Sequence, residues 1–493
     1  MEMSDPLLRF GVVSDIHARL ADDGKSLVDG LGIETFEVAL REFQNWGADA
    51  VVVAGDLTDS GLVRELEAVA AAWFRVFPGD CAPDGRKVER LFVLGNHDAC
   101  GLRNGRRVFA DDATLRREAI ETDPQGAWRR CFGEDYEPFF AKNVKGFDFF
   151  CVHWKPGIWC NGYAETGCAG CGEMFRAKME ACAPSRPFFY VQHPHPAGTV
   201  YGRLAWGADD GSSTRLLSRF QNAVVFSGHS HEPLTNERSI WRGAFTSVAT
   251  GSLQYVSANA VGNRAEGATA GYMNGVCNWH EPGVTREERI ARMTQYDAPK
   301  TMPVEVNAFD VRSGLFVTVY AGRVEVARRE FVSGLDLGEP WLIPITGRDA
   351  PMARPPYGCF VKSSPPPRFP ANAVLAATFI DAPTRGIDWH EIHIAPETRP
   401  ALRLDFPAAT LGGPVSEYEI SAIGATGVRF ATRICAIGGL YPPEHPRFAA
   451  PERAVIPPDR FPPGAEAVTV TPLDSLGRRG QPLVAAMPIL PCD

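Results

Sequence analysis

One short apolar run constrains the fold of this chain more than any other stretch. Residues 50–54 read A-V-V-V-A, which predicts a strand buried on both faces of a sheet. The run leads into Gly55 and Asp56, so a carboxylate lies just past the carboxyl end of a buried strand, where ligands bind in open α/β sheets. Taken alone, Asp56 could equally cap the helix that is expected to begin near Ser60. The residues at the ends of the neighbouring strands decide between these two roles.

The first hundred residues alternate between strand and helix patterns. Apolar runs predict strands at 8–14 and 90–94 on either side of the first run. Apolar residues spaced by three and four positions predict helices at 35–46 and 62–77. Strand, helix, strand, helix, strand implies right-handed crossovers and parallel pairing. We therefore expect an α/β fold, with further strands at 146–154, 188–192, 223–227 and 245–249.

The residues directly after these strands carry polar ligand chemistry. They are two aspartates, one asparagine and four histidines: Asp15, His17, Asp56, Asn96, His193, His229 and His231. Mixed nitrogen and oxygen ligation suits zinc, iron or manganese better than calcium, which prefers oxygen alone. The set is large enough for two divalent ions if Asp56 bridges them. Two ions roughly 3.5–4 Å apart are a recurrent device for displacement at phosphorus.

Each motif has a structural alternative when it is taken alone. The D-x-H and H-x-H pairs place both side chains on one face of an extended segment, as chelation requires, but such pairs also occur in surface turns. His193 and His195 both lie in Q-H-P-H-P, and either could reach a metal. We prefer His193 because it directly follows a predicted strand. The tetrapeptide 95–98, G-N-H-D, is the most specific piece, because asparagine is a poor strand residue.

The ordered blocks D-x-H, G-D, G-N-H-D, H and G-H-x-H resemble those of the calcineurin-like metallophosphoesterases, in their phosphodiesterase-like branch. The resemblance spans about residues 8–330 and implies a four-layer α/β/β/α sandwich. It implies that one metal ion is held by Asp15, His17, Asp56 and His231. It implies that the other is held by Asp56, Asn96, His193 and His229, with Asp56 shared.

The resemblance also implies a reaction. A metal-bound hydroxide would attack a phosphodiester, with manganese, iron or zinc as the two ions. His97 would face the substrate and protonate the leaving oxygen, and Asp98 would hold the His97 ring in the required tautomer. Asp59 would support this site or cap a helix. A phosphomonoesterase is the alternative within the class, and a non-catalytic binding protein is the alternative outside it.

The last third of the chain has a different pattern. Residues 348–370 carry many of the 40 prolines and are expected to form a linker between a catalytic domain, 1–347, and a second domain, 371–493. Short strand signals at 374–380, 390–394, 418–422, 429–435 and 467–472 predict a β-sandwich. It resembles a fibronectin type III or immunoglobulin-like module, a type that can contact a glycan or a protein.

Composition limits the partners of this chain. A net charge of −9 argues against a nucleic-acid substrate, so we expect a small phosphoester. No apolar run of 18 residues occurs, so no transmembrane helix is expected. A strand-like run begins by Leu7 and leaves no room for a signal peptide. A cytoplasmic location is therefore expected, and export stays open if a longer precursor exists.

Four cysteines gather in one glycine-rich segment: Cys160, Cys168, Cys171 and Cys182. The pair at 168 and 171 forms a C-x-x-C, but a structural zinc site normally needs a second such pair. The sequence leaves open whether these four thiols bind zinc, form a disulfide or remain free.

Overall fold

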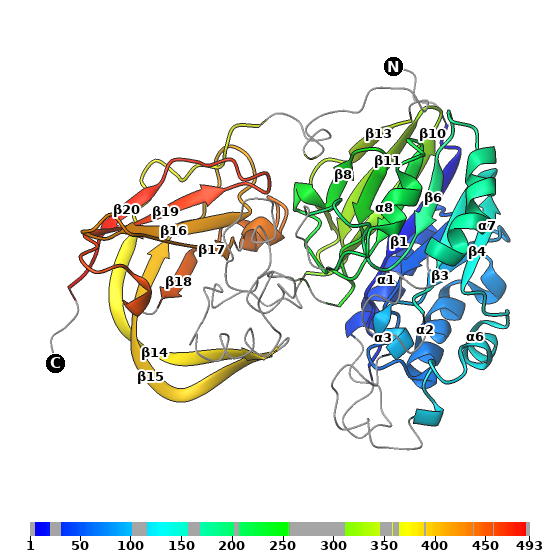
Figure 1. The fold of residues 1–493 in the computed structure, drawn as a ribbon, viewed down its shortest axis with the longest axis horizontal. Helices are drawn as coiled ribbons and strands as arrows, with labels where there is room; N and C mark the ends of the chain where they lie inside the picture. Colours follow the sequence, from blue (N-terminus) through cyan, green and yellow to red (C-terminus); the bar gives the residue numbers. More distant parts are fainter. Residues whose placement is uncertain are drawn as a thin grey trace.

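The fold contains an α/β part followed by a part made of strands (Figure 1). It is a computed structural model, which describes residues 5–19, 31–100, 116–155, 168–201, 207–254, 256, 311–345, 357, 364–388, 391–436, 438–456 and 458–489. The long excursion expected at 256–303 and most of the expected proline-rich linker lie outside these residues.

The first sheet has seven strands in the order β12-β11-β10-β1-β2-β3, with β13 also paired to β11. Strands β1, β2 and β3 are parallel, as the strand and helix alternation predicts. Strands β10 and β11 extend the sheet antiparallel beside β1. The bounds are β1 (Leu8–Val13), β2 (Ala50–Ala54), β3 (Glu89–Val93), β10 (Ser313–Tyr320), β11 (Arg323–Glu330), β12 (Leu335–Asp336) and β13 (Trp341–Pro344).

The second sheet has six strands in the order β4-β5-β6-β7-β9-β8. Its central strands β5, β6, β7 and β9 are parallel, and β4 and β8 are antiparallel edges. The bounds are β4 (Phe139–Val144), β5 (Phe147–Val152), β6 (Phe188–Val191), β7 (Ala223–Ser227), β8 (Ile240–Arg242) and β9 (Thr246–Ala249).

These two sheets and their helices form four layers, which confirms the expected α/β/β/α sandwich. One apolar core lies between the two sheets and contains side chains from both. A second core lies between the first sheet and helices α1 (Leu31–Trp46), α2 (Val63–Val76) and α6 (Pro124–Phe132). A third lies between the second sheet and helices α7 (Cys168–Ala181) and α8 (Ser212–Leu217).

The sequence of α1 shows why these layers form. Phe36, Leu40 and Phe43 recur at helical spacing and are completely buried against the first sheet. The helix stops before Gly47, whose φ of 84° is a left-handed conformation that glycine adopts without a steric penalty. Strand β2 is buried at every residue, because helices cover one face of its sheet and the second sheet covers the other.

The C-terminal part is all-β, as expected. One sheet has the order β14-β15-β18 and the other β17-β16-β19-β20. A shared apolar core between them contains Leu402, Leu404 and Phe406 from β15 and Tyr418 and Ile420 from β16. The bounds are β14 (Ala376–Asp388), β15 (Glu391–Phe406), β16 (Glu417–Ile423), β17 (Arg429–Cys435), β18 (Glu452–Ile456), β19 (Ala467–Leu473) and β20 (Leu483–Ala486). A fibronectin-like identity and the three domain boundaries stay predictions.

Two further observations bear on the expectations. Among the helices that the structure describes, none has both the length and the apolar character that crossing a bilayer requires. Helix α7 occupies much of the expected cysteine-bearing loop, Cys160 lies outside the described residues, and the side chains of Cys168 and Cys171 are not described. Cys182 donates a hydrogen bond from Sγ to the carbonyl oxygen of Lys178 at 3.4 Å.

Candidate metal centre

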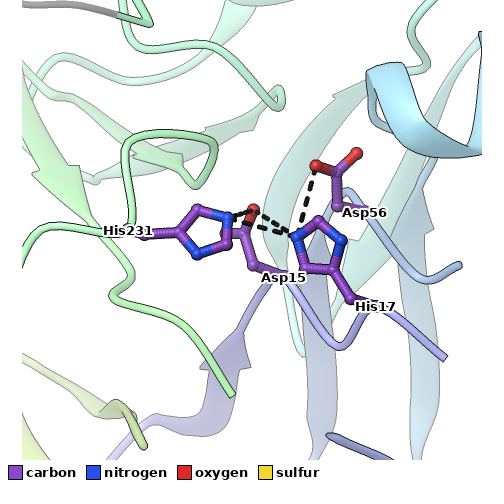
Figure 2. Close-up of side chains that lie close together, drawn as sticks. All are labelled: Asp15, His17, Asp56 and His231. Carbon is purple, nitrogen blue, oxygen red and sulfur yellow. Dashed lines mark hydrogen bonds and ion pairs between the residues drawn. The ribbon is translucent and has the colours of Figure 1, made fainter. Parts of the chain in front are cut away.

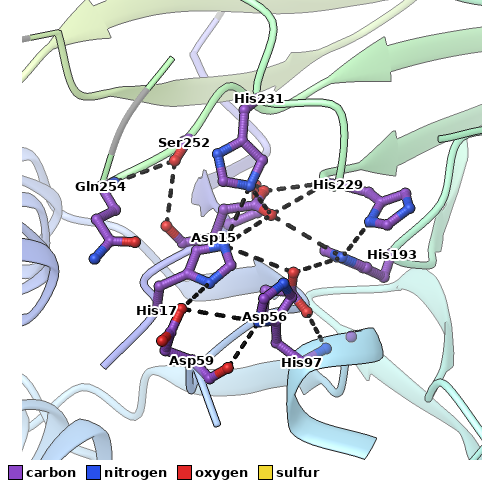
Figure 3. Close-up of polar contacts among 12 residues, drawn as sticks. Asp15, His17, Asp56, Asp59, His97, His193, His229, His231, Ser252 and Gln254 are labelled. Carbon is purple, nitrogen blue, oxygen red and sulfur yellow. Dashed lines mark hydrogen bonds and ion pairs between the residues drawn. The ribbon is translucent and has the colours of Figure 1, made fainter. Parts of the chain in front are cut away.

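The polar side chains after five parallel strands meet at one edge of the two sheets (Figure 3). Strand β1 leads to Asp15 and His17, β2 to Asp56, β3 to Asn96, β6 to His193, and β7 to His229 and His231. The carboxyl ends of parallel strands lie at the same edge of a sheet, and both sheets present this edge to the same place. The fold thus brings together all seven residues that the sequence selected. Which of them bind metal stays a prediction until it is measured.

Four of these side chains form a first group: Asp15, His17, Asp56 and His231 (Figure 2). One potential ligand atom of each lies within 4.8 Å of the others. His231 Nε2 is 3.0 Å from Asp15 Oδ1, and His17 Nε2 is 3.8 Å from that same oxygen. The two imidazole nitrogens face each other at 3.1 Å. This group has the composition that the resemblance assigned to the first ion.

A second group contains Asp56, His193 and His229. His193 Nε2 lies 3.1 Å from His229 Nδ1 and 3.1 Å from Asn96 Oδ1. The other nitrogen of this ring, His193 Nδ1, is 2.8 Å from the carbonyl oxygen of Ala54. Because a carbonyl oxygen only accepts, Nδ1 carries a proton, and in the neutral ring Nε2 presents its lone pair to the group.

Asp56 belongs to both groups. Its Oδ2 lies 3.7 Å from His17 Nε2 in the first group and 3.1 Å from His193 Nε2 in the second. Its Oδ1 accepts a hydrogen bond from the backbone N–H of His97 at 2.9 Å, which fixes the orientation of the carboxylate. One oxygen therefore points between the two groups, as a bridging ligand must.

The backbone at these positions is unusual. Five of the seven residues have a positive φ: Asp15 (53°), His17 (46°), Asp56 (51°), His229 (70°) and His231 (53°). Non-glycine residues rarely adopt this conformation, which costs free energy and persists only where the surroundings enforce it. Such residues cluster at functional sites, so the backbone supports the same assignment as the side chains.

Glycines at the strand ends allow the groups to pack this tightly. A Cβ atom on Gly95 would lie 2.2 Å from Asp56 Oδ1, and one on Gly228 would lie 2.5 Å from Asp15 Oδ2. A Cβ on Gly55 would lie 2.3 Å from His193 Nδ1. Real Cβ atoms do not approach other atoms this closely, so each G-D, G-N-H-D and G-H-x-H block needs its glycine for steric reasons.

The electrostatics of the site favour bound positive charge. Burial alone would raise the pKa of Asp15, but His231, His17 and His193 hold it well below its usual range. Asp56 behaves similarly, because the nearby imidazoles of His193 and His97 lower its pKa despite its burial. Burial would lower the pKa of His193, but Asp56 raises it to about 9. The two carboxylates are therefore ionised and attract protons or cations to the imidazoles.

The donor set fits divalent cations. Each group combines carboxylate oxygens with imidazole nitrogens, and the nitrogens approach each other in pairs at 3.1 Å. Two imidazole lone pairs that face each other are satisfied when a proton or a cation lies between them. Mixed nitrogen and oxygen ligands of this kind suit zinc, iron or manganese. The two groups could therefore hold divalent metal, and the number and identity of the ions belong to the proposal below.

The role expected for Asp98 is wrong. Its carboxylate accepts hydrogen bonds from the backbone N–H groups of Gly95 (2.7 Å), Leu57 (3.1 Å) and Thr58 (2.7 Å), and from Thr58 Oγ1 (2.7 Å). Asp98 follows His97 directly in the short helix α3 (Asn96–Cys100), so the two side chains leave the helix in different directions. Asp98 therefore braces the turn after β2 instead of holding the His97 ring.

Asp59 occupies the place that the sequence interpretation gave to Asp98. The carbonyl oxygen of Asp59 lies 2.7 Å from His97 Nδ1, which therefore carries the proton of the neutral ring. The Asp59 carboxylate lies 3.4 Å from His17 Nδ1. Asp59 thus orients both an expected ligand and the expected acid. Of its two roles, the sequence slightly favours helix capping, but the N-cap of α2 is Leu62.

Three other residues near the site, His195, His153 and Trp154, belong to neither ligand group. His195 lies outside both groups, and its backbone N–H donates to the carbonyl oxygen of Gly207. His153 follows β5 and accepts a hydrogen bond at Nδ1 from the backbone N–H of Leu94 at 2.9 Å. The Trp154 ring lies 5.8 Å from that of His229, between centroids, and so borders the second group.

Three hydroxyl residues near Asp15 were not foreseen. Ser14 Oγ donates to Asp15 Oδ2, and it lies 2.6 Å from Thr250 Oγ1. Ser252 Oγ lies 3.3 Å from the carbonyl oxygen of Asp15. The position of Thr250 and Ser252 directly after β9, which is the parallel neighbour of β7, was the available signal.

One comparison with known proteins identifies a family. Residues 8–233 match the family model described as calcineurin-like phosphoesterase. No curated protein matches the chain. Solved structures that resemble it include a dimetal phosphatase from Danio rerio, at 11% identity and a TM-score of 0.38, covering 69% of this chain and 100% of that one. Purple acid phosphatase PPD1 from yellow lupin (Lupinus luteus) seeds is 13% identical with a TM-score of 0.40, covering 69% and 54% of the two chains.

The four-layer fold and the strand-end cluster of aspartates and histidines are typical of a metal-dependent hydrolase. Residues 8–233 are therefore identified as a calcineurin-like phosphoesterase region of the chain. The chain is a hydrolase that acts on phosphoric ester bonds with the help of divalent metal.

Proposed function

We propose that the chain is a binuclear metallophosphoesterase that hydrolyses a small phosphodiester. Asp56 carries the argument. One of its oxygens lies 3.7 Å from His17 Nε2 and 3.1 Å from His193 Nε2, each of which belongs to a different ligand group. A carboxylate that serves both groups supports two adjacent ions and not a single one. Mixed ligation by nitrogen and oxygen favours manganese, iron or zinc.

The two groups have distinct ligand sets in this proposal. The first ion is held by Asp15, His17, Asp56 and His231, and the second by Asp56, Asn96, His193 and His229. When bound, the ions activate water and neutralise the charge that develops on the phosphoryl oxygens. The protein contributes the fixed positions of these ligands, which its strand ends and glycines determine.

In this proposal, His97 faces the substrate and protonates its leaving oxygen. Its side chain is 16% exposed, whereas those of His17 and Asp56 beside it are 1% exposed. Its Nδ1 is bonded to the Asp59 carbonyl, so Nε2 is the atom that can deliver a proton to the leaving oxygen. Burial lowers the pKa of His97 from its usual value, which makes the protonated ring a stronger acid.

A diester substrate is the finer part of the proposal. It rests on the G-N-H-D and G-H-x-H blocks, which resemble those of the phosphodiesterase branch of the family. The overall charge of −9 is consistent with a small-molecule substrate, because a polymeric nucleic acid would be repelled.

The test compares hydrolysis of bis(p-nitrophenyl) phosphate with that of p-nitrophenyl phosphate, with manganese present. We expect faster cleavage of the diester, and loss of both activities in Asp56→Asn. Faster cleavage of the monoester would replace the diester by a phosphomonoester substrate. Equal activity in wild type and Asp56→Asn would contradict the role of the shared carboxylate.

A further inference from the structure

Two turns of the C-terminal part, at Gly439 and Ser475, contact the segment that directly follows His231. Thr235 Oγ1 donates a hydrogen bond to the carbonyl oxygen of Gly439. The backbone N–H of Glu237 donates to Ser475 Oγ at 3.1 Å, and Arg238 Nε donates to the carbonyl oxygen of Ser475 at 2.8 Å. Three successive contacts therefore hold a segment that begins four residues after an expected metal ligand.

A second contact leads to Asp15. Val256 and Val311 from the first part of the chain form one buried apolar cluster with Cys435, Leu440 and Tyr441 from the C-terminal part. Four residues before Val256, Ser252 Oγ lies 3.3 Å from the backbone carbonyl of Asp15, and it accepts a hydrogen bond from the N–H of Gln254 (Figure 3). Ser252 therefore links the segment beside this apolar cluster to the backbone of Asp15.

Buried acidic residues lie on both sides of this contact. Glu417 on β16 is 2% exposed and lies 3.4 Å from Arg433 on β17. Burial raises the pKa of Glu417 to about 8, Arg433 opposes the rise, and Glu232 from the first part of the chain adds to it. Glu232, the residue after His231, is 2% exposed as well. Acidic side chains from the two parts are thus buried at the same contact.

The loop at residues 229–231 has a strained backbone. His229 and His231 have φ values of 70° and 53°. Such conformations persist only where surrounding contacts enforce them. Residues 229–231 are followed within seven positions by all three hydrogen bonds to the C-terminal part. The contact through Ser252 reaches Asp15, which belongs to the same ligand group as His231.

We propose that the C-terminal β part is a positioning module of the metal centre, which holds the His229–His231 loop and the backbone of Asp15 in ligating geometry. This inference rests on the proposed function, because it concerns the same ligand groups. It assigns the C-terminal part a role inside the catalytic unit and not that of an independent binding module. The first ligand group depends on it most, because both lines of contact end there.

The test is the full-length variant Leu440→Glu, which places a carboxylate in the apolar cluster of the interface. Leu440 is 0% exposed and packs in that cluster, whereas the core between the two C-terminal sheets is built from other residues. The matched control is Leu411→Glu, at a leucine of the same part that is 46% exposed. Thr235→Val removes one hydrogen bond across the interface and covers the case in which Leu440→Glu does not fold.

Two readouts decide the outcome. Hydrogen–deuterium exchange over residues 228–238 should rise in Leu440→Glu, with or without added metal, and stay unchanged in Leu411→Glu. Competition with a chelator should show metal affinity about 10-fold to 100-fold lower in Leu440→Glu. Thr235→Val should change both readouts in the same direction by less.

The contrary results are equally clear. If exchange rises over residues 435–441 in Leu440→Glu, which reports undocking, but stays unchanged over 228–238 and metal affinity is unaltered, the positioning role is excluded. If wild type binds no metal, the proposed function fails, and the exchange over 228–238 still decides whether the C-terminal part holds this loop.

Discussion

At the scale of single residues, three consecutive side chains, Asn96, His97 and Asp98, point in different directions and have different roles. Asn96 faces the second ligand group, His97 reaches the surface of the site, and Asp98 turns back to brace the loop after β2. A short helix begins at Asn96, so consecutive side chains point in different directions. One turn of helix thus lets three consecutive residues of the G-N-H-D block reach three different surroundings.

Replacing His97 should therefore separate chemistry from metal binding. We expect His97→Ala to retain its metal and to lower kcat by about 100-fold, because the loss is that of a general acid. Metal content and kcat, measured on the same preparation, check this. The matched variant His193→Ala should lose metal. Loss of metal from His97→Ala would show that His97 is a ligand.

The residues after strands could be predicted from sequence, but their supporting partners could not. Asp15, Asp56 and His193 come after apolar runs in a way that only the edge of a sheet explains. The hydrogen bonds of Asp98 and Asp59 depend on side-chain direction within turns, which no periodicity encodes. Ser14 and Thr250 meet across 236 positions, and nothing in either stretch alone indicates that contact.

At the scale of elements, hydrogen bonds join the first and second sheets next to the G-N-H-D block. His153, after β5 of the second sheet, accepts a hydrogen bond at Nδ1 from Leu94, after β3 of the first sheet. The backbone N–H of Trp154 donates to the carbonyl oxygen of Leu94 at 2.9 Å. Leu94 precedes the G-N-H-D block, so these bonds fix where that block leaves its strand.

This contact makes the folded protein sensitive to acid. Burial lowers the pKa of His153 to about 3, from an ordinary value near 6.5. Between these values the unfolded chain binds more protons than the folded one, so stability falls as the pH is lowered from 6.5. The slope for this group is about 1.4 kcal/mol per pH unit.

His153→Asn should remove that slope while keeping an acceptor for the N–H of Leu94. Urea unfolding of both proteins between pH 8 and pH 4.5 measures it. We expect the free energy of unfolding of wild type to fall more steeply with acid than that of the variant. Parallel curves would show that His153 is not buried in its neutral form.

Elements in the interior were easier to predict than those at edges. Strands β1, β2, β3, β6 and β7 are buried on both faces and read as apolar runs. Strands β4, β8, β12, β13, β18 and β20 were missed, since they are short or lie at sheet edges where polar residues are tolerated. The hairpin β14–β15 is longer than its two predicted fragments, because Pro383, Pro396 and Pro400 read as turns.

At the scale of the whole molecule, the two sheets that carry the site are in contact with the C-terminal part. Two sheets packed face to face supply the ligands from their carboxyl ends. The C-terminal part contacts the segment after His231 and packs against Val256. The long sequence separation of these contacts explains why the sequence predicted two parts but not how closely the second is tied to the first.

The central claim is that one carboxylate serves two metal ions, and counting the ions tests it most directly. The measurement is metal content per chain, by inductively coupled plasma mass spectrometry, in wild type, Asp56→Asn and Asp49→Asn. Asp49 is the matched control, because it is buried at the other end of the same strand, where it bonds Arg9 and Lys145. We predict two ions in wild type and in Asp49→Asn, and loss of both in Asp56→Asn. One ion in wild type, or two ions in Asp56→Asn, would contradict the account.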